Sequence, residues 1–172
     1  MRARVAMLIA WTVLLGGCSS GVEGSPVAAE RWDPCSIPDE AIQATGLDPA
    51  TKDEGWGEGI VVDDWAVCEY LLPGARAAYA LAVLSSVDHT IVEARAKSAN
   101  RDGRDLVVGG RDAYMYKTEF GAAIRDCNIA LEVPPGVVVF TVLYQKDDGA
   151  DACEIGLAHV HDLESAVPAV PK

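Results

Sequence analysis

The most regular pattern of apolar and polar positions lies in the last third of the chain. Every second residue from Cys127 to Val133 is apolar, which is the pattern of a strand that buries one face. A Pro-Pro-Gly turn follows, and residues 137–145 form a further apolar run. From residue 152 the period lengthens, so that Cys153 and the apolar residues after it share one stripe of a helix. The pattern therefore predicts two strands followed by a C-terminal helix.

Shorter apolar runs, separated by proline, glycine and polar turns, predict the rest of the fold. Helices are expected over 37–45 and 91–99, and strands over 60–72, 77–87, 106–108 and 112–118, with a glycine-rich acidic loop over 53–59. Thr90 and Glu93 have the spacing of a capping box at the start of the second helix. Together these elements predict an α+β fold: an antiparallel sheet of about five or six strands, with short N-terminal, middle and C-terminal helices packed on it.

The first eighteen residues have the features of a secretory signal. Arg2 and Arg4 precede an apolar run over 5–15, and small residues follow it. The run has eleven residues, far fewer than the roughly 20 that a helix needs to span a bilayer. The Leu-Gly-Gly-Cys sequence that ends at Cys18 resembles the lipobox of bacterial lipoproteins. That resemblance implies that Cys18 becomes the N-terminus and carries a diacylglycerol and a further acyl chain. An ordinary signal peptide with an incidental cysteine is the alternative.

These features divide the chain into four parts. Residues 1–17 are the expected signal peptide, 18–32 the lipidated cysteine and a small, polar, flexible tether, 33–168 a single globular domain, and 169–172 a C-terminal tail. Acyl chains on Cys18 would hold the protein in membrane lipid. The expected location is therefore the outer, extracytoplasmic face of the cell membrane.

The number of cysteines supports this division. The chain has five, and if Cys18 is lipidated the other four can pair. Patterning favours a Cys127–Cys153 disulfide, because the first lies on the buried face of a strand and the second on the buried stripe of a helix. A Cys35–Cys68 disulfide would likewise join the first helix to the first long strand. Zinc binding by four cysteines is the competing interpretation, but the chain has no Cys-x-x-Cys spacing, and no metal site is expected.

The charge of the chain excludes two kinds of partner. It has 14 Lys and Arg against 26 Asp and Glu, for a formal net charge of −12. A protein needs a basic face to bind the phosphates of nucleic acid, or to bind an anionic lipid surface through a polybasic patch. Neither interaction is expected here.

Histidines and acids are the first candidates for metal binding or catalysis. His159 and His161 lie on the expected C-terminal helix, about 200° apart around its axis, so they cannot share a metal ion and are interpreted as solvated side chains. His89 is expected to help the second helix begin. The acids of 147–151, with Glu154, could bind calcium, but they lack the spacing of an EF-hand loop. Their alternative role is to favour the N-terminus of the last helix.

The remaining candidate for a binding site is a ligand lip, by which we mean exposed residues at the edge of the domain that would contact a ligand. Trp56 lies among acids in the 53–59 loop, and Trp65 follows a few residues later. Aromatic side chains with an apolar body suit a contact with a ligand at the edge of the domain. A flexible, solvated loop is the alternative interpretation of the same residues.

The expected domain lacks the motifs of a nucleophilic enzyme. It contains no Gly-x-Ser-x-Gly, no Ser-x-x-Lys and no phosphate-binding loop. The sequence therefore favours a non-enzymatic binding or accessory module of the cell envelope, with no cofactor, whose partner is an envelope protein, a glycan or a lipid. The alternative is an envelope hydrolase or transferase that uses paired carboxylates from among Asp63, Asp64 and Glu69.

Several short segments of the expected domain carry a family resemblance. Asp33-Pro34-Cys35-Ser36 opens a short helix, Trp65 lies near Cys68, a Val-Val-Gly-Gly-Arg-Asp-Ala segment ends at residue 113, and cysteines follow at 127 and 153. Together these resemble the DUF3558 lipoproteins of actinobacteria, over about residues 30–168. In that family we expect the aromatic residue just after the second cysteine rather than three residues before it. The resemblance implies a location and a fold but no activity. The order of elements is also compatible with PsbP/Mog1-like folds.

Overall fold

The structure is a computed structural model that describes residues 30–57, 60–74, 77–118, 125–146 and 149–169. The expected signal peptide, Cys18 and most of the tether and tail lie outside these residues. The elements in chain order are η1 (Pro34–Ser36), α1 (Asp39–Ala44), β1 (Asp48–Glu54), β2 (Ala66–Leu71), β3 (Tyr79–Ser86), α2 (Ile91–Ala96), β4 (Asn100–Val108), β5 (Arg111–Thr118), β6 (Arg125–Val133), β7 (Gly136–Tyr144), α3 (Ala152–Leu163) and η2 (Glu164–Ala166). No helix in the described part of the chain has the length and apolar character needed to cross a membrane.

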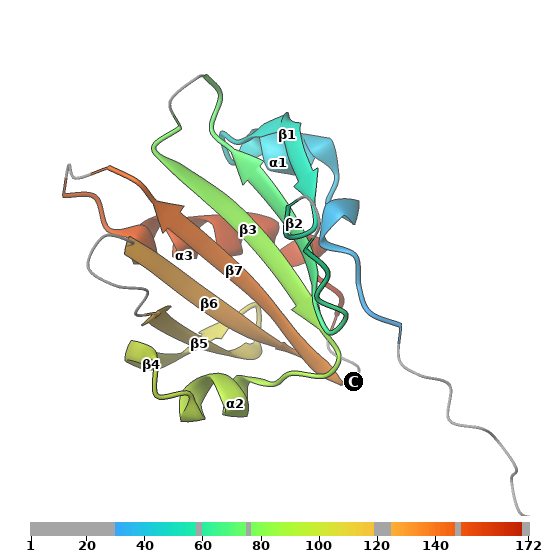
Figure 1. Cartoon of the computed structure of the whole chain (residues 1–172), viewed down its shortest axis with the longest axis vertical. Helices are drawn as coiled ribbons and strands as arrows, with labels where there is room; N and C mark the ends of the chain where they lie inside the picture. Colours follow the sequence, from blue (N-terminus) through green and yellow to red (C-terminus); the bar gives the residue numbers. More distant parts are fainter. Residues whose placement is uncertain (1–29, 58–59, 75–76, 119–124, 147–148, 170–172) are drawn as a thin grey trace, which may run out of the picture.

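The strands form one antiparallel sheet in the order β1-β2-β3-β7-β6-β5-β4 (Figure 1). The α+β class is confirmed, but the sheet has seven strands rather than five or six. The additional strand is β1, which lies at an edge and is exposed at most positions, so it shows no apolar alternation. The opposite edge strand, β4, begins at Asn100, whereas the sequence predicted a start at residue 106. The first half of β4 was not predicted because it is also polar and exposed. Residues 60–65, expected as strand, precede β2 as a loop.

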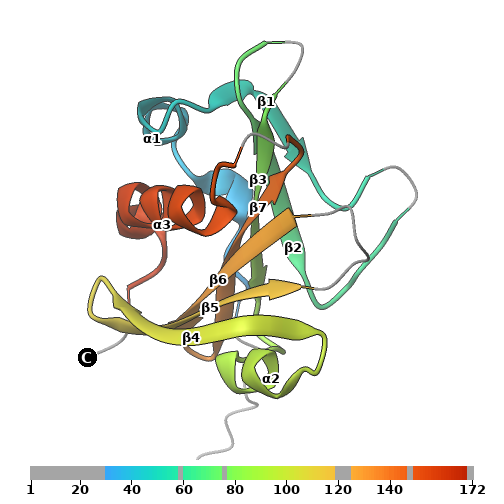
Figure 2. The ribbon, with the colours of Figure 1, turned by 90° about the vertical axis from the view of Figure 1, so that its left-hand side faces the viewer.

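The main core lies between one face of the sheet and helices α1 and α3, which Figure 2 shows on the same side of it. Phe140 in β7 and Ile129 in β6 are partners in the sheet, and both are fully buried. Helix α3 comes close to the sheet at Gly156, where a Cβ atom would lie 2.7 Å from Cδ1 of Ile129. A larger residue at 156 would therefore require the end of the Ile129 side chain to move. The helices α1 and α3 therefore cover one face of the sheet, and a binding site can form on the opposite face.

Two disulfides join helical segments to the sheet, and they are the two predicted pairs. Cys127–Cys153 links β6 to the first turn of α3, and Cys35–Cys68 links η1 to β2. Asp151, one of the acids of the possible calcium loop, caps α3 instead: its Oδ1 accepts a hydrogen bond from the backbone N–H of Cys153 at 2.7 Å. Its neighbours Asp147 and Asp148 lie outside the described residues.

His159 is buried, and the prediction of a solvated side chain was wrong. It is 4% exposed, and its Nε2 lies 2.8 Å from the hydroxyl oxygen of Tyr79. His159 lies three residues after Gly156 and four before Leu163, so it shares the helix face that packs on the sheet. Burial lowers its pKa, because the charged imidazolium is poorly solvated there. His161, on the other side of the helix, is exposed as expected.

Candidate functional site

The face of the sheet opposite α3 carries a groove. Side chains alternate along a strand, so Val139 and Thr141 of β7 both point to this open face, away from the core residue Phe140. Helix α2 packs over one end of the face, with Ile91 against Ala130. The loop between β1 and β2 projects on the side of the sheet away from α3 (Figure 2). The floor of the groove is therefore sheet, and its walls are α2 and this loop.

The groove consists of two adjoining cavities. The first, which we call the α2 pocket, has a volume of about 420 Å³ and is lined by Trp65, His89, Thr90, Glu93, Ala94, Lys97, Asn100, Tyr116, Ala130, Val137 and Val139. The second, the loop pocket, has a volume of about 470 Å³ and is lined by Asp53, Gly55, Trp56, Gly57, Val67, Glu69, Ala82, Leu84, Thr118, Asp126, Asn128, Thr141 and Leu143. They adjoin because Val139 and Thr141, next to each other on this face of β7, line one pocket each. Each volume is in the range of small-molecule sites, roughly 300–1,000 Å³.

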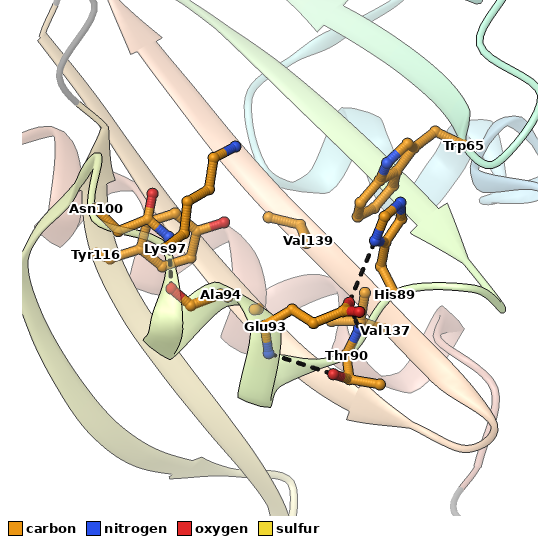
Figure 3. Close-up of a pocket in the computed structure, with 11 residues that line it drawn as sticks. Trp65, His89, Thr90, Glu93, Ala94, Lys97, Asn100, Tyr116, Val137 and Val139 are labelled. Atoms are coloured by element: carbon orange, nitrogen blue, oxygen red, sulfur yellow. Dashed lines mark hydrogen bonds and ion pairs between the residues drawn. The ribbon is translucent and has the colours of Figure 1, made fainter.

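The α2 pocket has an apolar floor with polar side chains at both ends. Ala130 and Val139, from β6 and β7, form part of the floor. Figure 3 shows the side chains at the two ends of the pocket: Trp65 and His89 at one, and Lys97, Asn100 and Tyr116 at the other. Such a site suits a ligand with an apolar middle and a hydrogen-bonding group at its end.

Asn100 has one unused hydrogen-bonding atom in this pocket. Its Nδ2 donates to the backbone carbonyl of Ala94 at 2.7 Å and so holds the end of α2 in place. Its Oδ1 is buried without a hydrogen-bond partner in the described structure. Nearby, burial and the charge of Asp126 raise the pKa of Tyr116 to about 12, so its hydroxyl keeps its proton. The pocket therefore offers the Tyr116 hydroxyl as a donor, whereas the Asn100 Oδ1 is buried.

His89 connects the β1–β2 loop to helix α2. Its Nε2 lies 2.6 Å from Asp64 Oδ2, and its Nδ1 lies 3.2 Å from Glu93 Oε2. The imidazole ring stacks on the indole of Trp65, with the ring centres 4.9 Å apart. A neutral imidazole has one N–H, so only the protonated ring can donate to both carboxylates. The hydrogen bond with Asp64 raises the pKa of His89 and lowers the pKa of Asp64.

The start of α2 follows the predicted capping box. The hydroxyl oxygen of Thr90 accepts from the backbone N–H of Glu93, and Oε2 of Glu93 accepts from the backbone N–H of Thr90 at 2.8 Å. Because the same Glu93 oxygen also faces His89, the histidine supports the beginning of the helix, as expected. The wall of the α2 pocket is thus fixed by contacts local in sequence together with the contacts that Asp64 and Trp65 of the β1–β2 loop make with His89.

We expect His89 to titrate above its usual value of 6.5 and His159 to titrate below it. Because the proton on His89 is bound more tightly in the folded state, its contribution to the free energy of unfolding is complete below pH 6.5. That contribution is lost as the pH rises through the folded pKa. The imidazole signals followed by NMR against pH give both pKa values. Asp64→Asn should lower the pKa of His89 and leave that of His159 unchanged. A pKa for His89 at or below 6.5 would contradict the two carboxylate contacts.

The loop pocket combines apolar and acidic residues. Glu69 of β2 and Asp53 of β1 are direct partners in the sheet, and burial together with the charge of Asp53 raises the pKa of Glu69. Trp56 stands at the margin of this pocket. Ala82 and Leu84 of β3 supply part of its apolar surface. The pocket therefore places one carboxyl group of weakened acidity beside a second carboxylate and an aromatic ring.

Asp126 in the loop pocket belongs to a closed hydrogen-bond network. Its carboxylate accepts from the backbone N–H of Thr118 and from Nδ2 of Asn128, each at 2.8 Å. The Asn128 Oδ1 accepts in turn from the hydroxyl of Thr141 at 2.7 Å. These polar groups satisfy one another across three strands, which stabilises a polar floor at this end of the groove.

The residues predicted for a ligand lip or a carboxylate site do not meet at one point. Trp56 lines the loop pocket, whereas Trp65 lines the α2 pocket. Among the three named acids, Asp63 is exposed, Asp64 pairs with His89, and Glu69 lies in the loop pocket. The described residues hold no group of three or more His, Cys, Asp or Glu side chains arranged to bind a metal.

Several residues of the groove could not be predicted from the sequence, because their neighbours in the structure come from distant segments of the chain. Asp53 meets Glu69 only through the pairing of β1 with β2, and β1 itself has no apolar pattern. Lys97 and Asn100 follow a short helix and look like an ordinary polar turn. The one usable signal was Tyr116, which alternates with Ala113 and Met115 and so had to face away from the core.

A comparison with family models places the chain among known sequences. The model described as "Protein of unknown function (DUF3558)" matches residues 13–165, which is most of the chain. Neither the curated proteins nor the solved structures contain a match. The chain belongs to the DUF3558 family.

Proposed function

We propose that this member of the DUF3558 family is a lipoprotein, anchored at the extracytoplasmic face of the cell membrane, that binds an envelope component without catalysing a reaction on it. Its N-terminal residues support the location, because a short apolar run ends at the lipobox-like cysteine Cys18. The other four cysteines form two disulfides, as is usual for a domain that folds outside the cytoplasm.

The groove is the observation that carries the binding function. It joins two cavities of about 420 and 470 Å³ across the open face of the sheet. Its floor contains small and apolar residues such as Ala130 and Leu84, while Trp56 and Trp65 stand at the walls. A concave, largely preformed site with a few polar groups is the usual form of a ligand site.

The charges of the groove restrict the chemistry of its ligand. Asp53, Glu69 and Asp126 lie at the loop end, and the whole chain carries a net charge of −12, so an anionic ligand would be repelled. The Tyr116 hydroxyl, which lines the α2 pocket and keeps its proton, can donate a hydrogen bond to a ligand. A neutral amphiphile, with an apolar body and hydroxyl or amide oxygens that accept hydrogen bonds, satisfies both conditions.

Glu69 and Asp53 favour a second candidate function, a hydrolase acting on envelope glycans. A carboxyl group with a raised pKa beside a second carboxylate is the arrangement found in glycoside hydrolases. We favour binding over catalysis because Asp53 is exposed at the edge of the sheet, while Asp126 and Glu93, the further acids that line the groove, are engaged in hydrogen bonds.

Binding of a neutral amphiphile is expected to change the fluorescence of Trp65. The probe is octyl glucoside, which has an alkyl chain and sugar hydroxyls and is used below its micelle concentration. We expect a saturable shift of the emission to shorter wavelength as the alkyl chain covers the floor of the α2 pocket. Ala94→Gln places a longer side chain in the pocket, and we expect it to weaken binding about tenfold, a loss of roughly 1.4 kcal/mol.

The matched control for this test is Ala96→Gln. Ala96 lies on the same helix but is exposed and outside the pocket lining, so this variant should bind like the unchanged protein. Equal weakening by both variants, or a signal that never saturates, would argue against a site in the groove. Release of a cleaved product from an envelope glycan, lost in Glu69→Gln, would favour the hydrolase instead.

A further inference from the structure

Two large apolar side chains are exposed together on the loop between β1 and β2. Ile60 is 58% exposed and its neighbour Val61 is 82% exposed. Trp56, on the same loop, is 39% exposed. Single exposed apolar residues are common, but grouped ones mark surfaces that contact something else. Ile60 and Val61 therefore form a candidate contact surface.

The N-terminal end of the described chain is fixed beside this loop. The guanidinium of Arg31 donates a hydrogen bond to the backbone carbonyl of Asp63. The backbone carbonyl of the next residue, Trp32, accepts a hydrogen bond from the hydroxyl of Ser85 in β3. Asp63 is only three residues from Ile60, and three residues span at most about 11 Å. The segment that leads to Cys18 therefore leaves the domain close to the exposed pair.

The length of that segment limits the distance between the loop and the anchor. Cys18 and Glu30 are twelve residues apart in the sequence. Twelve residues extend to about 43 Å at most, whatever their conformation. A lipid at Cys18 therefore holds the membrane surface within reach of Ile60 and Val61. Val107, an apolar residue that is 69% exposed, lies on β4 at the opposite edge of the sheet from β1.

We propose that Ile60 and Val61 insert into the bilayer that holds the Cys18 anchor, and so fix the orientation of the domain on the membrane. This inference rests on the proposed anchoring of the protein. The occupant is a lipid surface of low negative charge, because Asp53, Glu54 and Asp63 lie close to the pair in the sequence and would repel an anionic one. In this orientation the loop pocket, which Trp56 lines, lies next to the bilayer, from which a neutral amphiphile could enter the groove.

The test attaches the lipid chemically, so that it does not depend on acylation in cells. The chain from Cys18 onward contains every described element, and its Cys18 thiol is coupled to a maleimide lipid in phosphatidylcholine vesicles with brominated acyl chains. Bromine quenches tryptophan that enters the acyl region. With Trp32, Trp56 and Trp65 replaced by phenylalanine, Val61→Trp is the probe. Val107→Trp is the matched control, since it also replaces an exposed valine.

We expect the brominated lipid to lower the fluorescence of the Val61→Trp protein about twofold, as for a side chain at the boundary of the acyl region, and to leave the Val107→Trp protein unchanged. Added phosphatidylglycerol should reduce the quenching. Equal quenching of both proteins, or of neither, overturns the proposal.

A second measurement keeps all native tryptophans and compares the emission of the anchored protein with and without Ile60→Ser and Val61→Ser. We expect these two changes to remove the shift to shorter wavelength that anchoring causes, and an unchanged shift overturns the proposal. Failure of acylation at Cys18 in cells is a separate result, which concerns the proposed function alone.

Discussion

Replacing Cys18 with alanine is expected to abolish the incorporation of fatty acid into the protein completely. In the proposed anchor, the sulfur of Cys18 carries the diacylglycerol, and alanine has no atom that can hold it. The measurement is growth of the producing bacterium with an alkyne analogue of palmitate, followed by detection of the label on the purified protein. Mass spectrometry of the unchanged protein should find an acylated peptide that begins at residue 18.

The control for this result is the double variant Cys127→Ala with Cys153→Ala. It removes two cysteines that the structure pairs with each other, so the label should remain. The remaining pair, Cys35 and Cys68, is also engaged and offers no alternative thiol. Label that persists in Cys18→Ala, or a Cys18 thiol found free or in a disulfide, would contradict the proposed anchor.

The sequence predicted best those elements whose two faces meet different environments. Strand β6 alternates because Cys127 and Ile129 face the apolar main core, while Asp126 and Asn128 face the polar network of the groove. The prediction that only one face of β6 is buried was wrong, because Asp126 and Asn128 are buried as well. Helix α3 has a stripe because it packs on the sheet along one side only. From these two patterns the position of the Cys127–Cys153 disulfide could be predicted, since each pattern identifies the inward-facing cysteine.

The edge strands could not be predicted in the same way. Strand β1 forms hydrogen bonds with β2 through its backbone, and most of its side chains face solvent, so its sequence resembles a loop. The groove was hidden for a related reason. Its floor is built from β3, β6 and β7, whose alignment is a property of the sheet and not of any one segment. Trp56 and Trp65 were recognised as candidates, but the pairing that places them in different pockets was not visible.

The Cys127–Cys153 disulfide and the apolar packing of α3 both hold this helix on the sheet, but they do so in different ways. Helix α3 has twelve residues and is held by apolar contacts along one face, including Val160 and Leu163. An isolated helix of that length is marginal in water, so α3 depends on its tertiary contacts. The Cys127–Cys153 bond fixes its first turn on the sheet and closes a loop across 26 residues of sequence. Loss of this bond should therefore give the unfolded chain more conformational freedom and weaken the docking of α3 on the sheet.

Replacing Cys127 and Cys153 together with alanine is expected to lower the free energy of unfolding by about 3.5 kcal/mol, the entropic value for a loop of this length. The midpoint and slope of urea unfolding measure that change, and hydrogen exchange should show faster opening of α3 than of β7. Cys35→Ala with Cys68→Ala is the matched comparison. Its loop, across 33 residues, predicts a similar total loss, but with the faster exchange near η1 and β2. A loss below about 1 kcal/mol, or uniform exchange in both variants, would mean that packing alone holds α3 in place.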